Sequence, residues 1–159
     1  MSDLTHVDAE GAARMVDVTE KAVTSRVAIA SGVVHTTPDV VALLRSNGLK
    51  KGDALAVARI AGIMGAKRTP DLVPLCHPIA ITGVTVDFSL DESSVTITAT
   101  VRTSGQTGVE MEALTAVTVA GLTVHDMIKA VDPAAVLSEV RLDRKEGGKA
   151  GVWTRPEGR

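Results

Sequence analysis

A chain of 159 residues with a net charge of −2 has the length of one domain and no excess of positive charge for binding a phosphate backbone. Its 45% hydrophobic content is aliphatic, because Phe88 and Trp153 are the only Phe, Tyr or Trp residues. Readers of nucleic acid that stack bases on aromatic rings are therefore excluded, and we expect no nucleic-acid partner.

Cysteine content and hydropathy indicate the compartment. Cys76 is the single cysteine, so the chain forms no internal disulfide and suits a reducing environment. The first twenty residues mix charges of both signs and lack the apolar segment of a secretory signal. The longest uncharged runs, 72–86 and 113–124, are shorter than the ~20 apolar residues that cross a bilayer. We expect a cytoplasmic protein with no membrane partner.

The chain begins with an expected N-terminal arm over residues 1–24, where little periodicity is present. Residues 26–36 are rich in β-branched side chains and predict the first strand. A short helix over 39–46 follows Thr37, a typical N-cap, and Pro38, a typical first helical residue.

A second helix is predicted over residues 53–68, with Asp53 as its N-cap. Its many alanine and glycine residues indicate that another element packs very close to it. Residues 69–78 contain three prolines in ten positions, which disfavour regular helix and central strand. We expect a rigid, extended loop there.

Two alternating segments, 80–90 and 94–102, predict an antiparallel hairpin with one buried face. A glycine-punctuated turn over 103–108 then leads into a long helix, which ends before Pro133. Because this helix is uncharged in its middle and charged at both ends, it is the natural place to look for a site.

The last strand is predicted over residues 135–142, followed by a basic, Gly-rich tail over 143–159. The element order is then strand, helices, two strands, helix, strand, in a single domain over 1–159. This βαββαβ layout predicts an α+β, ferredoxin-like fold, with an antiparallel sheet and helices packed on one face.

One arc of the long helix, stepped at about 100° per residue, is expected to pack on the sheet. The opposite arc carries charged residues such as Glu112 and Asp126 only towards its ends. Its middle shows Val119 and Leu122 among threonines, where charged residues normally face water. A second subunit covering this arc is one explanation, and a solvent-exposed threonine face is the alternative. The arc expected to face the sheet consists of Leu114, Val117, Gly121, Val124, Ile128 and Val131.

Glu112 and Asp126 stand near opposite ends of this helix, fourteen residues or about 21 Å apart. One small ligand contacts both only if a two-fold partner brings the far end of its own helix alongside. Asp126 and Lys129 form an i, i+3 pair, which is either an acid–base pair or an ordinary surface ion pair.

Cys76 and His77 show no metal-ligand spacing with the other histidines, and adjacent residues of an extended segment point apart, which disfavours a Cys–His catalytic pair. His77 is either a ligand contact on a rigid loop or a structural histidine. Basic residues along the chain together suggest a polyanionic small molecule, although those of the tail alone fit a solvated end. They are Arg26, Lys51, Lys67, Arg68, Lys145 and Lys149.

Several long motifs closely resemble the MoaC family of cyclic pyranopterin monophosphate synthases, which act in molybdenum cofactor (molybdopterin) biosynthesis. The resemblance covers residues 4–151. The motifs that carry it are MVDVT at 15–19, KRTPDLVPLCHP at 67–78, TGVEMEALTA at 107–116, DMIKAV at 126–131 and GGKAG at 147–151.

The resemblance implies a lyase that converts (8S)-3',8-cyclo-7,8-dihydroguanosine 5'-triphosphate to cyclic pyranopterin monophosphate and diphosphate by acid–base catalysis. It also implies a cytoplasmic homohexamer, a trimer of dimers, with active sites at the dimer interfaces. No cofactor and no protein metal site are expected, and Mg²⁺ would enter only with the triphosphate. A non-catalytic ligand-binding module is the competing interpretation, since fold alone does not fix function.

The resemblance assigns catalysis to Asp126 as the acid/base, with Lys129 and Lys51 beside it. A carboxylate such as Glu112 suits the paired N–H groups of a guanine-type ring, and lysines suit a triphosphate. The substrate-binding residues that the resemblance implies are Leu75, Cys76, His77, Glu110, Met111, Glu112, Arg26, Asp17, Lys145 and Lys149.

Overall fold

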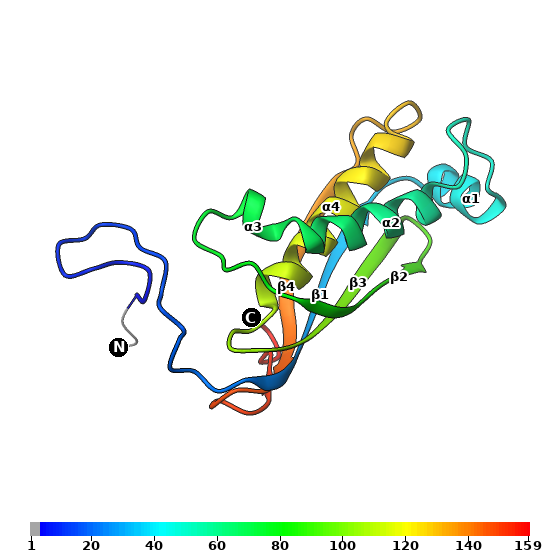
Figure 1. The fold of residues 1–159 in the computed structure, drawn as a ribbon. Coiled ribbons are helices and arrows are strands. Elements are labelled where there is room, and N and C mark those ends of the chain that lie inside the picture. The colour runs from blue at the N-terminus through cyan, green and yellow to red at the C-terminus, as the bar shows by residue number, and fades with distance from the viewer. Residues whose placement is uncertain (1–3) are drawn as a thin grey trace.

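The computed structural model describes residues 4–159 and shows an antiparallel sheet covered on one face by helices (Figure 1). Across the sheet the strands are ordered β2-β3-β1-β4-β5. The first four strands have the order and directions of a ferredoxin-like sheet, which confirms the predicted α+β fold. The strands are β1 (Thr24–His35), β2 (Ile81–Leu90), β3 (Ser94–Gly105), β4 (Val136–Glu146) and β5 (Trp153–Thr154).

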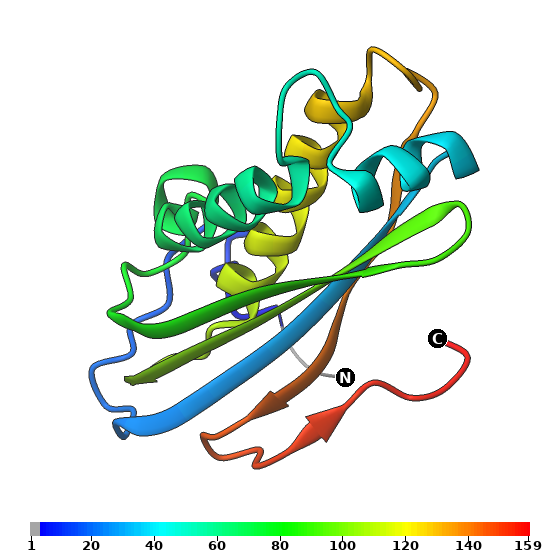
Figure 2. The ribbon, with the colours of Figure 1, turned by 90° about the vertical axis from the view of Figure 1, so that its right-hand side faces the viewer.

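The two long helices, α2 and α4, lie together on one side of the sheet (Figure 2). The predicted N-caps are confirmed: the Thr37 hydroxyl accepts from the Val40 N–H at 3.3 Å, and the Asp53 carboxylate accepts from the Ala56 N–H at 3.0 Å. The helices are α1 (Pro38–Ser46), α2 (Ala54–Lys67), α3 (Thr69–Leu72) and α4 (Glu110–Ile128).

The core lies between this helix pair and the inner face of the sheet. In β3, alternate residues such as Val95, Ile97 and Val101 are fully buried, as the period-2 pattern predicts. Val117, Val124, Ile128 and Gly121 of α4 are buried opposite them, and Leu114 is half-buried. The sheet-facing arc of α4 is therefore largely as predicted.

Two residues of α4 and its surroundings differ from the predicted arcs. Val131 lies beyond the end of the helix and is half exposed, because the chain turns after Ile128. Val119, expected on the open arc, packs instead under Gly65 of α2 in the same chain. Leu122 remains 66% exposed.

Helix α2 approaches α4 as closely as its alanine and glycine content predicted. A methyl group added at Gly62 would lie 2.9 Å from the backbone oxygen of Ala116 and 3.2 Å from Cβ of Ala120. Glycine is therefore required at Gly62 for this approach. The close contact fixes the direction of α4, and with it the placement of the charged residues at the two helix ends.

Two expectations for irregular segments are wrong. Residues Thr69–Leu72 form a helical turn, because Pro70 stands in the first turn, where its missing N–H costs nothing. The last strand does not end at residue 142: β4 continues to Glu146, and Trp153 of β5 then pairs with Lys145. The start of β1 offers hydrogen-bond partners to this segment, and backbone pairing overrides its charged composition.

The segment before β1 extends away from the body of the molecule as an arm (Figure 1). It contains an isolated bridge between Val7 and Ala13 and reaches β1 at Thr24, and residues 1–3 of the predicted arm lie outside the described residues. Among the described helices, none combines the length and the apolar character that crossing a membrane requires.

We expect Gly62→Ala to lower the free energy of unfolding by about 1–2 kcal/mol, because the methyl group forces α2 away from the Ala116 carbonyl. Urea unfolding measures the change. Gly83→Ala is the matched control, since its added methyl group would meet only Arg102 side-chain atoms at 3.9 Å. A Gly62→Ala protein as stable as this control would contradict the packing account.

Candidate active site

The lysine–aspartate cluster, defined as Lys51, Asp126 and Lys129, lies where the end of α4 meets the loop before α2. Lys129 Nζ is 2.8 Å from Asp126 Oδ1, and Lys51 Nζ is 3.1 Å from Asp126 Oδ2. Lys51 also donates to the backbone oxygen of Asp126 at 3.1 Å. Gly52, at φ +94°, makes the turn that presents Lys51 to the helix end. One carboxylate is thus held between two ammonium groups.

Hydrogen bonds from Lys129 and then Lys51, with the charges of both lysines, hold the pKa of Asp126 below its usual value. The three side chains are each about half exposed, so a ligand in solution can reach them. The cluster therefore presents an ionised carboxylate that can accept a proton, beside two ammonium groups that can donate protons or bind an anion.

The helix-start cluster, defined as Arg26, Glu110, Glu112, Lys145 and Lys149, lies at the other end of α4. Lys145 Nζ in β4 is 3.2 Å from Glu110 Oε1. With the turn after β4 and the turn before α4, these residues except Glu112 line a cavity of about 100 Å³. Lys149 is exposed at its edge.

Glu112 is the unusual member of this cluster, because its side chain is only 3% exposed. Within residues 4–159, its Oε2 atom is buried without a hydrogen-bond partner. Burial, and to a lesser degree the charge of Glu110, raises the pKa of Glu112 to about 7. The predicted outward position of Glu112 is wrong, because α3 and the following loop come over the start of α4. An unsatisfied buried carboxyl is a group prepared for a polar partner.

The loop after α3 brings Cys76 and His77 to the same region. Burial, with the charge of Glu112, raises the pKa of the Cys76 thiol, so the thiol stays protonated and is a poor nucleophile. Hydrogen bonds from the Thr19 hydroxyl and N–H lower the pKa of Asp17, and His77 adds to this shift through its charge. The structure thus places the N-terminal arm beside the loop of His77.

A second cavity, of about 330 Å³, adjoins His77 and includes Gln106, to which sequence analysis assigned no role. The Gln106 amide donates to the Thr19 carbonyl at 3.3 Å and ties the arm to the turn before α4. The position of Gln106 in that glycine-punctuated turn was the sequence feature that could have indicated a role for it. Leu75 is half-buried in the loop beside Cys76, and Met111 is 40% exposed at the start of α4.

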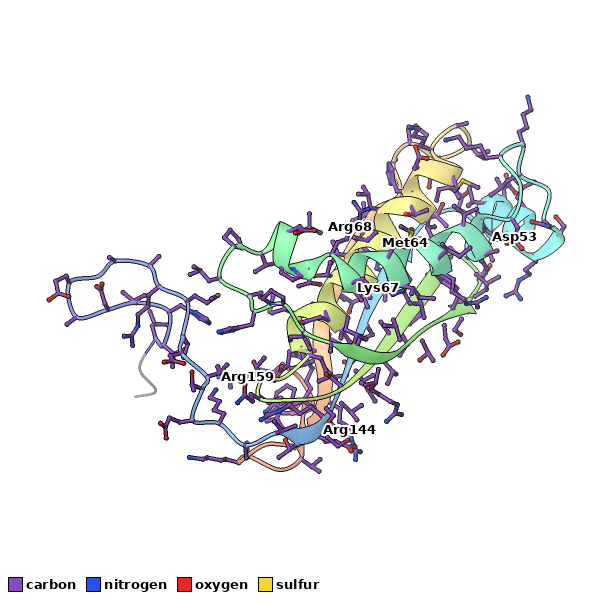
Figure 3. All side chains as sticks on the ribbon, viewed as in Figure 1. Asp53, Met64, Lys67, Arg68, Arg144 and Arg159 are labelled. Carbon is purple, nitrogen blue, oxygen red and sulfur yellow. The ribbon has the colours of Figure 1, made fainter. Side chains whose placement is uncertain are left out.

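The two clusters stand apart within one chain, as the spacing of Glu112 and Asp126 predicted. Helix α4 runs unbroken from Glu110 to Ile128 between them. In Figure 3, Asp53, two residues after Lys51, lies on the right of the view, and Arg144, next to Lys145 in the chain, lies at its lower edge. Within the described part of the chain, no group of three or more His, Cys, Asp or Glu residues is arranged to hold a metal ion.

Fold and site together define a class of protein. It is a ferredoxin-like α+β protein that has a carboxylate held by two lysines at one end of its long helix and a pocket lined by basic residues at the other. The profile of the MoaC family matches residues 15–148. The chain belongs to the MoaC family.

Curated relatives cover almost the whole chain. A cyclic pyranopterin monophosphate synthase of Streptomyces coelicolor is 66% identical over 152 residues, which are 96% of this chain and 89% of the relative. Cyclic pyranopterin monophosphate synthase 2 of Mycobacterium tuberculosis is 61% identical over 153 residues, 96% of this chain and 92% of the relative. A synthase of the same name from Dinoroseobacter shibae is 61% identical over 95% of this chain and 97% of its own length.

The raised pKa of Glu112 predicts a pH dependence of stability. The folded chain binds this proton more tightly than the unfolded chain, so the stabilisation is complete below about pH 4.5 and is lost as the pH rises through about 7. Relative to Glu112→Gln, we expect the wild-type free energy of unfolding to fall by on the order of 2 kcal/mol between pH 5 and pH 8.

Urea unfolding at pH 5, 6, 7 and 8, at one chain concentration, measures this difference. Glu92→Gln, in the exposed turn between β2 and β3, is the control and keeps the wild-type dependence. Parallel curves for wild type and Glu112→Gln would contradict the raised pKa.

Proposed function

We propose that this protein acts as a lyase that converts (8S)-3',8-cyclo-7,8-dihydroguanosine 5'-triphosphate to cyclic pyranopterin monophosphate and diphosphate in molybdenum cofactor biosynthesis. The observation that carries the proposal is its 61–66% identity, over nearly its whole length, to relatives named cyclic pyranopterin monophosphate synthase. The two charged clusters support it, because the reaction needs both a polyanion site and groups that move protons.

Proton transfer is assigned to the lysine–aspartate cluster. Since its lysines keep Asp126 ionised, the carboxylate begins the reaction as a proton acceptor, and Lys51 or Lys129 serves as the proton donor. Release of diphosphate leaves negative charge on the departing oxygen, and the same ammonium groups stabilise it. The chemistry involves no change of redox state, so we propose that no redox cofactor is required.

Recognition of the base-derived ring is assigned to the neighbourhood of Glu112. Its unpartnered Oε2 can accept from one donor of a guanine-type edge, and the two oxygens of the ionised carboxylate together can accept from the N–H and the exocyclic amine. Cys76 lies close enough to feel the charge of Glu112, with Leu75 and His77 on either side of it in the loop, and Met111 precedes Glu112 in the first helical turn. Lys145 and Lys149 supply positive charge near the same end for the phosphates.

A complete site then requires two chains, because α4 separates the clusters by about 21 Å within one chain. We propose a two-fold pair in which Glu112 of one protomer and Asp126 of the other face one substrate, within a cytoplasmic homohexamer. Exposed apolar residues on the outer side of the helix layer support burial by another subunit. They are Val57, Ile60 and Met64 of α2, of which Figure 3 labels Met64, and Leu122 of α4.

The purified protein, incubated with the cyclised GTP substrate, is expected to release one diphosphate per cyclic pyranopterin monophosphate formed, measured by a coupled diphosphate assay and by chromatography of the pterin. A heat-denatured sample is the control. Tight substrate binding without either product would instead support the ligand-binding module.

A mixing experiment tests the composite site. Asp126→Asn and Glu112→Gln proteins are each expected to lose about 10²-fold or more in turnover, because one loses its proton acceptor and the other its ring contact. Dissociated and reassembled together in equal amounts, they should recover about a quarter of the wild-type activity, since half of the pairs are mixed and each mixed pair has one intact site.

Glu92→Gln, which lies in the exposed turn between β2 and β3 and belongs to neither cluster, is the control and keeps full activity. No recovery in mixtures whose mixed pairs are demonstrated by mass spectrometry would overturn the two-chain site.

A further inference from the structure

Arg26 occupies the helix-start cluster, but its donors are already used inside the chain. It stands near the start of β1, opposite Thr103 of β3. Its Nε donates to the Gly105 carbonyl at 3.0 Å, and its Nη2 donates to the Gln106 carbonyl at 3.2 Å. Both carbonyls belong to the turn that leads into α4. Because these N–H groups donate to backbone oxygens, the guanidinium has fewer donors available for a phosphate.

The turn after β4 lies against the other side of the same guanidinium. Gly147 and Gly148 have φ of +98° and +72°, and neither has room for a side chain. A methyl group at Gly147 would meet the backbone oxygen of Ser25 directly and would lie 3.1 Å from Cα and Cγ of Arg26, and one at Gly148 would meet the Nη1 atom of Arg26 directly. The two glycines therefore allow this turn to approach β1 closely at Arg26, and they also allow its positive-φ backbone conformation.

Arg26 thus joins two turns, and each turn adjoins one of the two residues of an ion pair. The turn of Gly105 and Gln106 leads to Glu110, and the turn of Gly147 directly follows the strand of Lys145. Glu110 and Lys145 meet at 3.2 Å across the cavity. The start of α4 has no side-chain N-cap, because Val109 stands at that position. Its placement therefore depends on contacts from outside the helix.

We propose that Arg26 is a positioning residue that clamps the turn before α4 to the turn after β4, and so sets the place of Glu110 and Glu112 for substrate. The inference rests on the proposed function for its effect on catalysis, while the clamp itself is a property of the free protein. It replaces the expected direct substrate contact of Arg26 with an action through the backbone of two turns.

Substitutions distinguish a clamp from a role in which Arg26 supplies only positive charge. Arg26→Lys keeps the charge, but the clamp needs two directed donors in the plane of a guanidinium, which lysine lacks. A charge is also preserved when Gly148 gains a methyl group, whereas the clamp is pushed out of place. Gly151 is the matched position, since it has φ +64° and nothing within 4 Å of an added methyl group.

Arg26→Lys, Gly148→Ala and Gly151→Ala proteins are compared by two measurements. Amide hydrogen exchange of residues 105–112 is followed by mass spectrometry. We expect it to be about tenfold faster than in the wild-type protein in Arg26→Lys and in Gly148→Ala, and unchanged in the control, Gly151→Ala. Diphosphate release from the cyclised GTP substrate should show KM raised about tenfold in the first two, with kcat within about twofold of wild type.

Wild-type exchange over 105–112 in Arg26→Lys, or identical behaviour of Gly148→Ala and Gly151→Ala, would overturn the clamp. Because φ is nearly the same at the two glycines, backbone strain alone affects both variants equally. If the wild-type protein forms no product, the proposed function fails, and hydrogen exchange still decides whether Arg26 clamps the turns.

Discussion

The contact between Gly62 of α2 and the Ala116 carbonyl of α4 holds two helices together at a distance that no larger side chain permits. It makes α2 and α4 a single layer over the sheet and fixes the direction of α4. Because a helix of this length is stiff, its two ends occupy defined places, one beside Lys51 and the other beside β4. The acidic groups of the site and the lysines beside Asp126 are positioned from this layer or its loops, whereas Arg26 and Lys145 come from the sheet.

The two ends of α4 differ in electrostatic character. At its C-terminal end, a solvent-accessible carboxylate is kept ionised by two lysines. At its N-terminal end, burial favours the neutral form of Glu112 and leaves one of its oxygens without a partner. One end is thus prepared for proton transfer and charge stabilisation, and the other for selective recognition. Their separation is what makes a second subunit part of the proposed mechanism.

Glycine turns connect the site to the sheet. The turns before α4 and after β4 meet at Arg26. Its guanidinium occupies the space that a side chain at Gly148 would need, and the backbone of Ser25 and Arg26 lies against Gly147. The GGKAG segment therefore has a defined position, although its glycine-rich composition is typical of flexible segments. Backbone pairing of β4 with β1 and β5 holds this segment in place, although its composition alone resembles a loose tail.

The βαββαβ order, the caps at Thr37 and Asp53 and the separation of Glu112 from Asp126 were predictable from the sequence, because periodicity, capping chemistry and helix rise are local properties. The burial of Glu112, the position of Val119 under α2 and the hydrogen bonds from Arg26 to backbone carbonyls depend instead on tertiary contacts. Burial and hydrogen-bond partners depend on segments distant in sequence, and no local pattern specifies which segment covers a given residue.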